Sequence, residues 1–177
     1  MSSPPKKNDS KPPQKKGYEW RRRYRRQKTS IFYLPGKYTV ALMLLITAAL
    51  SFVPYLGKLA WIAPFLFLLF ERESRFLAFV SAETGLLTFL RSFIVIAMEL
   101  IQQILLQRAY SSRSDSAIIA ALTDTRWATV VNGVNVAYYV LMLLFLILAW
   151  SYYAVRIPGL AKLADRFVDQ LLPGKRD

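Results

Sequence analysis

The sequence predicts an all-α membrane protein, a polytopic bundle of four transmembrane helices followed by an amphipathic C-terminal helix. Two long segments carry almost no charge: Lys58 is the only charged residue between Tyr38 and Phe70, and positions 128–155 carry none. Each exceeds the roughly 20 apolar residues that cross a bilayer core of about 30 Å. Because a helix of a soluble domain needs apolar residues on one face only, these segments indicate a membrane.

The third observation is the placement of positive charge. The formal net charge is +13, and twelve of the 24 lysines and arginines lie in the first 37 positions. A basic arm beside a first membrane span usually marks the cytoplasmic side and contacts anionic lipid, so nucleic-acid binding is the less favoured alternative. We expect arginines between aromatic rings to contact lipid headgroups, namely Arg21, Arg22, Arg23, Arg25 and Arg26.

The first apolar block, 38–70, would form a helix of about 50 Å, which is too long for one upright span. Helix-breaking or charged residues interrupt it at Pro54, Gly57, Lys58 and Pro64. We therefore expect a hairpin with one arm over 39–53, a turn over 54–58 and a return arm over 59–70. The return arm would be about 18 Å long, so it needs a thinned bilayer or burial against neighbouring helices.

A second long helix is predicted over 76–106. Because it overshoots the membrane, its first two or three turns are expected to lie in the interface. A polar loop is expected over 107–127, with a short surface helix over 117–122.

The last span is predicted over 128–150, because Trp127 and Trp150 provide an aromatic belt at each end. After Pro158, apolar residues recur at helical spacing as far as Leu172, and charged residues take the other face. Such a helix lies on the membrane surface or packs under the bundle. The expected divisions are a disordered basic arm and juxtamembrane segment (1–37), a transmembrane domain (38–155) and an amphipathic tail (156–177).

Charge asymmetry favours four spans over three. With four spans, nineteen basic residues lie on the side of both termini and four on the other, and Arg91 is left in the membrane. With three spans the split is fifteen against seven. The positive-inside rule therefore places both termini in the cytoplasm.

Short motifs in three parts of the chain form one pattern. Residues 51–57 read Ser-Phe-Val-Pro-Tyr-Leu-Gly, residues 74–79 read Ser-Arg-Phe-Leu-Ala-Phe, and an Ile-Pro step stands at 157–158. This pattern resembles the Tic-type family, which includes the chloroplast inner-envelope import-channel subunit, its cyanobacterial homologues and small bacterial four-span proteins of unknown function. The matching residues are Pro54, Gly57, Pro64, Ser74, Phe76, Phe79 and Pro158.

The chain departs from the family pattern at two places. Glu83 stands where the family usually has Gln, and Phe79 or Val80 stands where bacterial members often have His. The resemblance implies the four-span fold, a membrane compartment and a role in a protein-translocation or transport assembly. The compartment expected is a bacterial plasma membrane, with a chloroplast or other organelle inner membrane as the alternative.

Polar residues inside the spans are the default candidates for function, because they are costly there. The candidate polar membrane path comprises Glu83, Arg91, Glu99, Gln102, Asn132 and Asn135. Eight-residue spacing gives about 12 Å of rise and about 80° of rotation, so the three ionisable residues form a winding stripe. Either this stripe serves ions or a translocating chain, or Glu83 and Arg91 snorkel to the interface, Glu99 lies near the opposite headgroups, and the asparagines bond a neighbouring helix.

The residue types present argue against catalysis. The chain has no Cys and no His, which excludes thiol and imidazole catalysis and removes the usual ligands of zinc, haem and iron–sulfur clusters. No catalytic motif is visible, so we expect a non-enzymatic protein with no cofactor and no metal.

The leading expectation for function is a subunit of a membrane assembly. One alternative is a scaffold or lipid-interacting protein that recruits partners through its basic arm, and another is a small solute channel formed by an oligomer. The expected partners are anionic membrane lipids and other membrane subunits or further copies of the chain.

Overall fold

The computed structural model of the chain describes residues 21–24, 28–29, 34–53, 55–71, 73–111 and 125–172. These residues are mostly helical, which confirms the all-α prediction. In chain order the elements are β1 (Arg21–Arg23), α1 (Gly36–Phe52), the 3₁₀ helix η1 (Leu56–Lys58), α2 (Ile62–Phe70), α3 (Arg75–Ser111), α5 (Thr125–Trp150), β2 (Tyr153–Val155) and α6 (Leu160–Leu171).

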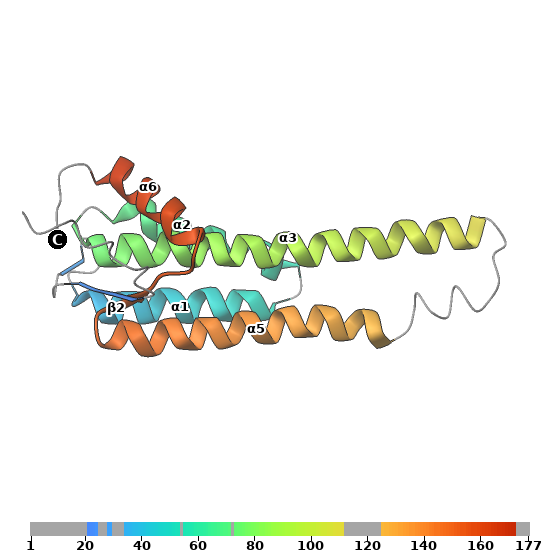
Figure 1. Cartoon of the computed structure of the whole chain (residues 1–177), viewed down its shortest axis with the longest axis horizontal. Helices are drawn as coiled ribbons and strands as arrows, with labels where there is room; N and C mark the ends of the chain where they lie inside the picture. The colour runs from blue at the N-terminus through green and yellow to red at the C-terminus, as the bar shows by residue number, and fades with distance from the viewer. Residues whose placement is uncertain are drawn as a thin grey trace, which may run out of the picture.

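The helices run alternately in opposite directions along one long axis (Figure 1). α1 leads away from the end that holds the two strands, η1 and α2 return, α3 leads away again, and α5 returns. α6 then crosses over α3 at the strand end (Figure 1). α3 extends far beyond the ends of α1 and α2, and α5 accompanies it along part of this extension (Figure 1).

The first hairpin forms as predicted, with shifted boundaries. α1 starts at Gly36 rather than at position 39. The turn after α1 contains η1 and three further turn residues, so it extends to Trp61 rather than ending at position 58. The return helix therefore has nine residues instead of twelve. Pro64 is the third residue of α2, where a backbone N–H has no partner within the helix, so its ring is tolerated. Pro54 lies outside the described residues.

α3 is a single helix of 37 residues with a well-defined start. The Ser74 hydroxyl oxygen accepts a hydrogen bond from the backbone N–H of Leu77 at 3.2 Å, which caps the helix. Glu71 in turn accepts a hydrogen bond from the backbone N–H of Ser74 at 2.7 Å. The helix continues to Ser111, so the first part of the predicted polar loop is helical, and the predicted surface helix over 117–122 lies outside the described residues.

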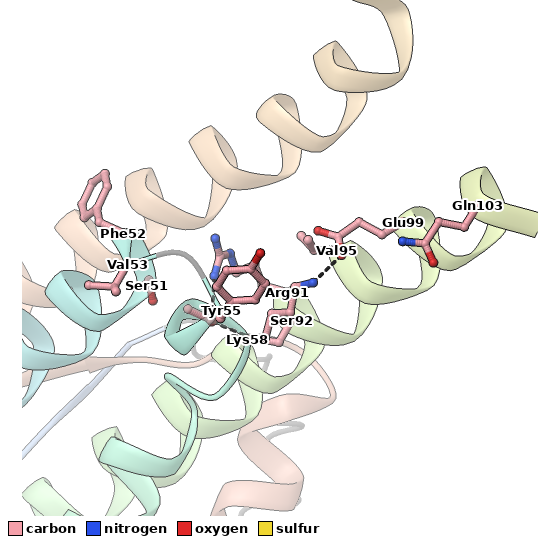
Figure 2. A pocket seen from close by; sticks show the side chains of 11 residues that line it. Ser51, Phe52, Val53, Tyr55, Lys58, Arg91, Ser92, Val95, Glu99 and Gln103 are labelled. Carbon is pink, nitrogen blue, oxygen red and sulfur yellow. Dashed lines mark hydrogen bonds and ion pairs between the residues drawn. The ribbon is translucent and has the colours of Figure 1, made fainter. Parts of the chain in front are cut away.

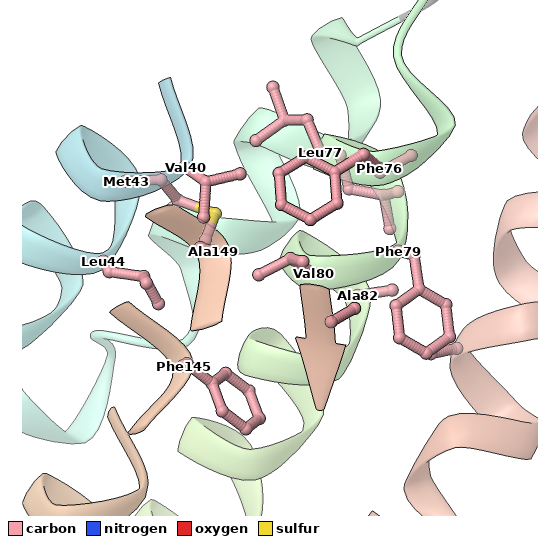
Figure 3. Close-up of a cluster of buried hydrophobic side chains, with 14 of the residues drawn as sticks. Val40, Met43, Leu44, Phe76, Leu77, Phe79, Val80, Ala82, Phe145 and Ala149 are labelled. Carbon is pink, nitrogen blue, oxygen red and sulfur yellow. The ribbon is translucent and has the colours of Figure 1, made fainter. Parts of the chain in front are cut away.

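The first turns of α3 form the centre of the hydrophobic core (Figure 3). Phe76, Leu77 and Phe79 are at most 1% exposed, and they pack with apolar side chains of α1, α5 and β2. Protein side chains therefore surround these turns, and their predicted depth, in the membrane interface, stays a prediction. Gly85 continues this close packing, since a Cβ there would come within 2.9 Å of the Phe65 ring on α2.

A short two-stranded sheet closes the strand end of the bundle. β1 pairs antiparallel with β2, and Arg22 lies opposite Ala154. The backbone N–H of Tyr24 continues the pairing by donating to the Tyr152 carbonyl at 2.9 Å. The arginine segment is thus held by backbone hydrogen bonds, which the sequence did not predict.

The amphipathic C-terminal helix packs on the bundle, one of the two placements expected for it. The side chains buried against α3 are small or branched, and they are Ala161, Ala164 and Val168. Arg75, at the start of α3, forms an ion pair with Asp169 of α6. Gly159 precedes α6 with a φ of 89°, a conformation that glycine adopts without steric cost.

Two helices in the described part of the chain are long and apolar enough to cross a membrane, Arg75–Arg108 and Trp127–Trp150. α1 is apolar but has 17 residues, and α2 has nine, so only two of the four predicted spans meet this criterion. Their most apolar windows are only 28% and 17% buried inside the protein. Long apolar helices that face outward to this extent indicate membrane association.

Candidate functional site

Polar side chains from four elements converge halfway along α3. The Arg91 Nε atom donates to the Asn135 side-chain oxygen on α5 at 2.9 Å, and its Nη1 atom donates to the Gly57 carbonyl in η1 at 3.2 Å. The guanidinium also lies over the Tyr138 ring, 5.3 Å from the centroid. Within the described ranges no carboxylate pairs with Arg91, so its positive charge is stabilised by neutral groups.

The Tyr138 hydroxyl extends this cluster into α1. It lies 3.1 Å from the Thr88 hydroxyl and 3.4 Å from the Ser51 hydroxyl. Tyr138 is 3% exposed, so its hydroxyl depends on these partners. The contacts join α1, α3 and α5 at one level of the bundle.

The η1 turn reaches Arg91 because Gly57 permits a very close approach to the end of α1. A Cβ on Gly57 would lie 2.7 Å from the Ser51 backbone oxygen. The Gly57 N–H donates to the Val53 carbonyl at 2.8 Å, which closes the turn. Tyr55, two residues earlier, has φ 65° and ψ −50°, close to a rare and strained γ-turn.

A cavity of about 520 Å³ lies beside this cluster (Figure 2). Its polar lining includes Ser51, Lys58, Arg91, Ser92, Glu99 and Gln103, and its apolar lining includes Phe52, Val53 and Val95. Lys58 and Glu99 form an ion pair at its rim, with their side chains 37% and 43% exposed. The cavity therefore combines one ion pair with one further positive charge.

The predicted polar path divides into separate sites. Arg91 and Glu99 line the cavity and Asn135 binds Arg91. Gln102 and Asn132 do not line it, and Asn132 is exposed. Glu83 lies elsewhere in the bundle, beside the segment that leads into α6.

Glu83 connects α3 to the segment that leads into α6. It is 1% exposed and accepts a hydrogen bond from the backbone N–H of Ile157 at 2.6 Å. Arg156, beside Ile157, pairs with Asp165 of α6 and lies 6.0 Å from the Phe79 ring centroid. The interpretation that Glu83 snorkels to the interface was wrong, because the carboxylate is enclosed by protein and fixes the C-terminal segment.

Sequence reasoning missed several residues of the cavity cluster. Lys58 lies in a turn, as predicted, and its position as the sole charge in a 33-residue stretch was a signal for the ion pair with Glu99. The hydroxyls of Ser51, Thr88 and Tyr138 carried no signal, because such residues are common in apolar helices. Their convergence depends on the packing of α1, α3 and α5.

A second cavity, of about 790 Å³, lies at the strand end. Its lining includes three cations, Arg23, Lys28 and Lys37, and the aromatic rings of Tyr38 and Trp150. The Lys37 ammonium is 5.0 Å from the centroid of each of these two rings.

The first three arginines predicted to contact headgroups form β1, and Arg23 lines this second cavity. Arg21 and Arg23 of β1 lie over the Tyr153 ring, at 5.3 and 5.8 Å from its centroid. Arg22 lies over the Tyr24 ring at 5.3 Å. Arg25 and Arg26 lie outside the described residues. Cations and rings at a shared surface suit an anionic lipid interface.

The described residues of the family-like motif occupy different parts of the bundle. Ser74 caps α3, Phe76 and Phe79 occupy the core, Pro64 is buried in the first turn of α2, and Pro158 is exposed before α6. Comparison of the chain with protein-family models, curated proteins and solved structures finds no match. Within the described residues, no group of three or more acidic side chains is placed to hold a metal ion.

Proposed function

We propose that this chain is a non-enzymatic integral membrane protein with four membrane-crossing segments, and that it is a subunit of a transport or protein-translocation assembly, as its Tic-type motifs imply. The observation that carries the proposal is the distribution of polarity. Large apolar side chains are exposed along α1, α2, α3 and α5, whereas the hydroxyl cluster and Glu83 are buried. This distribution is stable where lipid surrounds the helices.

The contacts of the return segment support four crossings despite the shortness of α2. Its Gly57 carbonyl lies beside Arg91 and Ser92, and its Glu71 carboxylate binds the N–H of Ser74. From Ser74 to Ser92, α3 rises about 27 Å, which is nearly the thickness of a bilayer core. The return segment therefore covers the same depth as α1 by combining a turn, a 3₁₀ helix and a short α-helix.

Charged and aromatic residues suggest the two edges of the membrane layer. Lys37, Arg75 and Trp150 lie at the strand end, and the Lys58–Glu99 ion pair lies at the other edge. Arg75 and Glu99 are separated by about 36 Å of helix, enough for the hydrocarbon core and part of the headgroups. The strand end, with β1 and α6, then lies on the side that we propose to be richer in basic residues, and the positive-inside rule favours the cytoplasm for that side.

The part of α3 beyond Glu99 supports a protein partner. About 18 Å of helix extends past this residue, outside the proposed layer. Its exposed apolar side chains are Leu100, Ile101, Ile104 and Leu105. Since lipid chains would not cover them there, another subunit is the natural cover.

A photo-crosslinking amino acid at Ile104 tests the subunit role, with Leu45, in the middle of α1, as the lipid-facing control. We expect the protein purified from its native membrane to carry a discrete protein adduct when the probe is at Ile104. The Leu45 probe should yield lipid adducts only. Mass spectrometry of the adduct names the partner, and the absence of any protein adduct from either position would contradict the subunit role.

The lipid-interacting scaffold is the second candidate, because the cationic cavity at the strand end favours it. Deletion of residues 1–20 removes five of the twelve basic residues of the arm and leaves the β1 segment, which pairs with β2, in place. If recruitment of soluble partners is lost while the Ile104 adduct persists, the scaffold role is favoured. The solute-channel candidate has less support, because Glu83 is separated from the cavity of Arg91 and Glu99.

A further inference from the structure

We propose that the cavity beside Arg91 is a binding site for an anionic phosphate group, presented by the headgroup of a membrane amphiphile. The proposal rests on the membrane placement proposed above, which puts the cavity just inside the edge marked by Lys58 and Glu99. A site of about 520 Å³ is within the range of about 300–1,000 Å³ that is typical of small-molecule pockets.

The charges that line the cavity favour an anion. Lys58 and Glu99 neutralise each other, whereas Arg91 has no carboxylate partner in the part of the chain that the structure describes. The lining therefore has a net charge of +1. A charge in a membrane-spanning region is stabilised by an opposite charge, and neutral partners satisfy it only in part.

Arg91 also retains hydrogen-bonding capacity toward the cavity. Its Nε and Nη1 atoms donate to Asn135 and Gly57, and no described residue accepts a hydrogen bond from Nη2. The two protein contacts and the Tyr138 ring hold the guanidinium plane in place. A fixed guanidinium with a remaining donor is suited to a phosphate oxygen.

The rest of the lining matches the other parts of an amphiphile. Phe52, Val53 and Val95 supply apolar surface beside the polar atoms, and Phe52 and Val53 are exposed, 72% and 42%. The exposed Tyr55 side chain lies in front of Arg91 in Figure 2. An acyl chain can thus lie along the end of α1 while the phosphate reaches Arg91.

Native mass spectrometry of the full chain in a neutral detergent tests the site. The probes are phosphatidylglycerol, zwitterionic phosphatidylcholine and inorganic phosphate, each titrated separately. We expect one phosphatidylglycerol molecule to bind more tightly than the others and phosphatidylcholine to show no such first adduct. Arg91→Gln should weaken this first binding by about tenfold, because a charge-assisted hydrogen bond and the net charge are lost.

Glu99→Gln is expected to tighten binding, an effect that a misfolded variant would not produce. Removal of this carboxylate leaves Lys58 with a neutral partner and raises the net charge of the lining, so the first binding should tighten by about fivefold. Arg91→Lys keeps the charge and should retain intermediate affinity. Lys162→Gln, on the exposed face of α6, is the matched control and should leave the affinity unchanged.

The outcomes separate the source of the phosphate from the existence of the site. If inorganic phosphate alone binds and shows the same dependence on Arg91 and Glu99, the anion site stands and its ligand is a free anion. If Arg91→Gln and wild type bind every probe equally, or Glu99→Gln weakens binding, the proposal is overturned. Because the measurement needs no partner protein, failure of the subunit role leaves its result unaffected.

Discussion

The guanidinium of Arg91 and the side-chain amide of Asn135 join α3 and α5 at the level where α1 ends, through a hydrogen bond of 2.9 Å. Asn135 presents a neutral oxygen to a full positive charge, and Gly57 presents another. Two helices of the bundle are thus fixed by a group whose charge the described residues leave uncompensated. Both the stability of this region and its affinity for anions depend on that arrangement.

Asn135→Asp should separate stability from anion binding. A carboxylate at this position pairs with Arg91, so the free energy of unfolding should rise by about 1 kcal/mol. The same change removes the net positive charge of the cavity, and the affinity for phosphatidylglycerol should fall. Thermal unfolding in detergent and lipid titration measure the two effects, and an equal or higher lipid affinity would contradict the electrostatic account.

Gly57→Ala should destabilise the bundle, because its Cβ would meet the Ser51 backbone oxygen at 2.7 Å and displace η1. We expect a loss of about 1–3 kcal/mol in the free energy of unfolding. Gly133→Ala in α5 is the matched control, since no atom lies within 4 Å of the added Cβ. That change should stabilise by about 0.5–1 kcal/mol through helix propensity. Equal effects of the two substitutions would refute the close approach of η1 to α1.

Substitutions of Glu83 should depend on whether an acceptor for the Ile157 N–H remains. Glu83→Gln keeps a side-chain oxygen there, so the free energy of unfolding should change by less than about 0.5 kcal/mol. Glu83→Leu leaves the N–H without its acceptor and should cost about 2 kcal/mol. Proteolysis of the C-terminal segment in detergent provides a local readout, and equal protease sensitivity in the two variants would exclude this role.

Tyr138→Phe should lower the free energy of unfolding by about 1 kcal/mol, because it removes the hydroxyl that links Thr88 and Ser51. The loss is limited because each partner keeps a backbone acceptor: Thr88 donates to the Thr84 carbonyl and Ser51 to the Thr47 carbonyl. Tyr139→Phe, on the adjacent and more exposed residue, is the control for thermal unfolding. A larger loss for the control than for Tyr138→Phe would contradict the importance of the buried hydroxyl.

Long-range patterns in the sequence were enough to predict the helical class and most helices. Charge depletion located α5 and the first hairpin, and helical periodicity located α6, because each signal extends over many residues. The two strands, Arg21–Arg23 and Tyr153–Val155, were not predicted. Three residues are too few to show an alternating pattern, and the two segments that pair are far apart in the sequence.

The candidate site was predicted in part. Arg91, Glu99 and Asn135 were identified because polar residues are rare inside apolar helices, and the structure brings the first two to one cavity. The predicted stripe assumed an undivided path along α3. Its division could not be read from spacing alone, because Glu83 is bound by a backbone N–H that is distant in sequence, and Lys58 reaches Glu99 only through the η1 turn.

Single-cysteine labelling tests the four crossings most directly, because the chain contains no cysteine of its own. A membrane-impermeant maleimide is added to either side of sealed native membranes that contain one single-cysteine variant each. The four variants are Leu56→Cys, Lys162→Cys, Leu45→Cys and Leu66→Cys. The account predicts labelling of Lys162→Cys from the side of the termini, of Leu56→Cys from the opposite side only, and of the other two from neither side. Labelling of Leu56→Cys from the side of the termini, or from neither side, would contradict it.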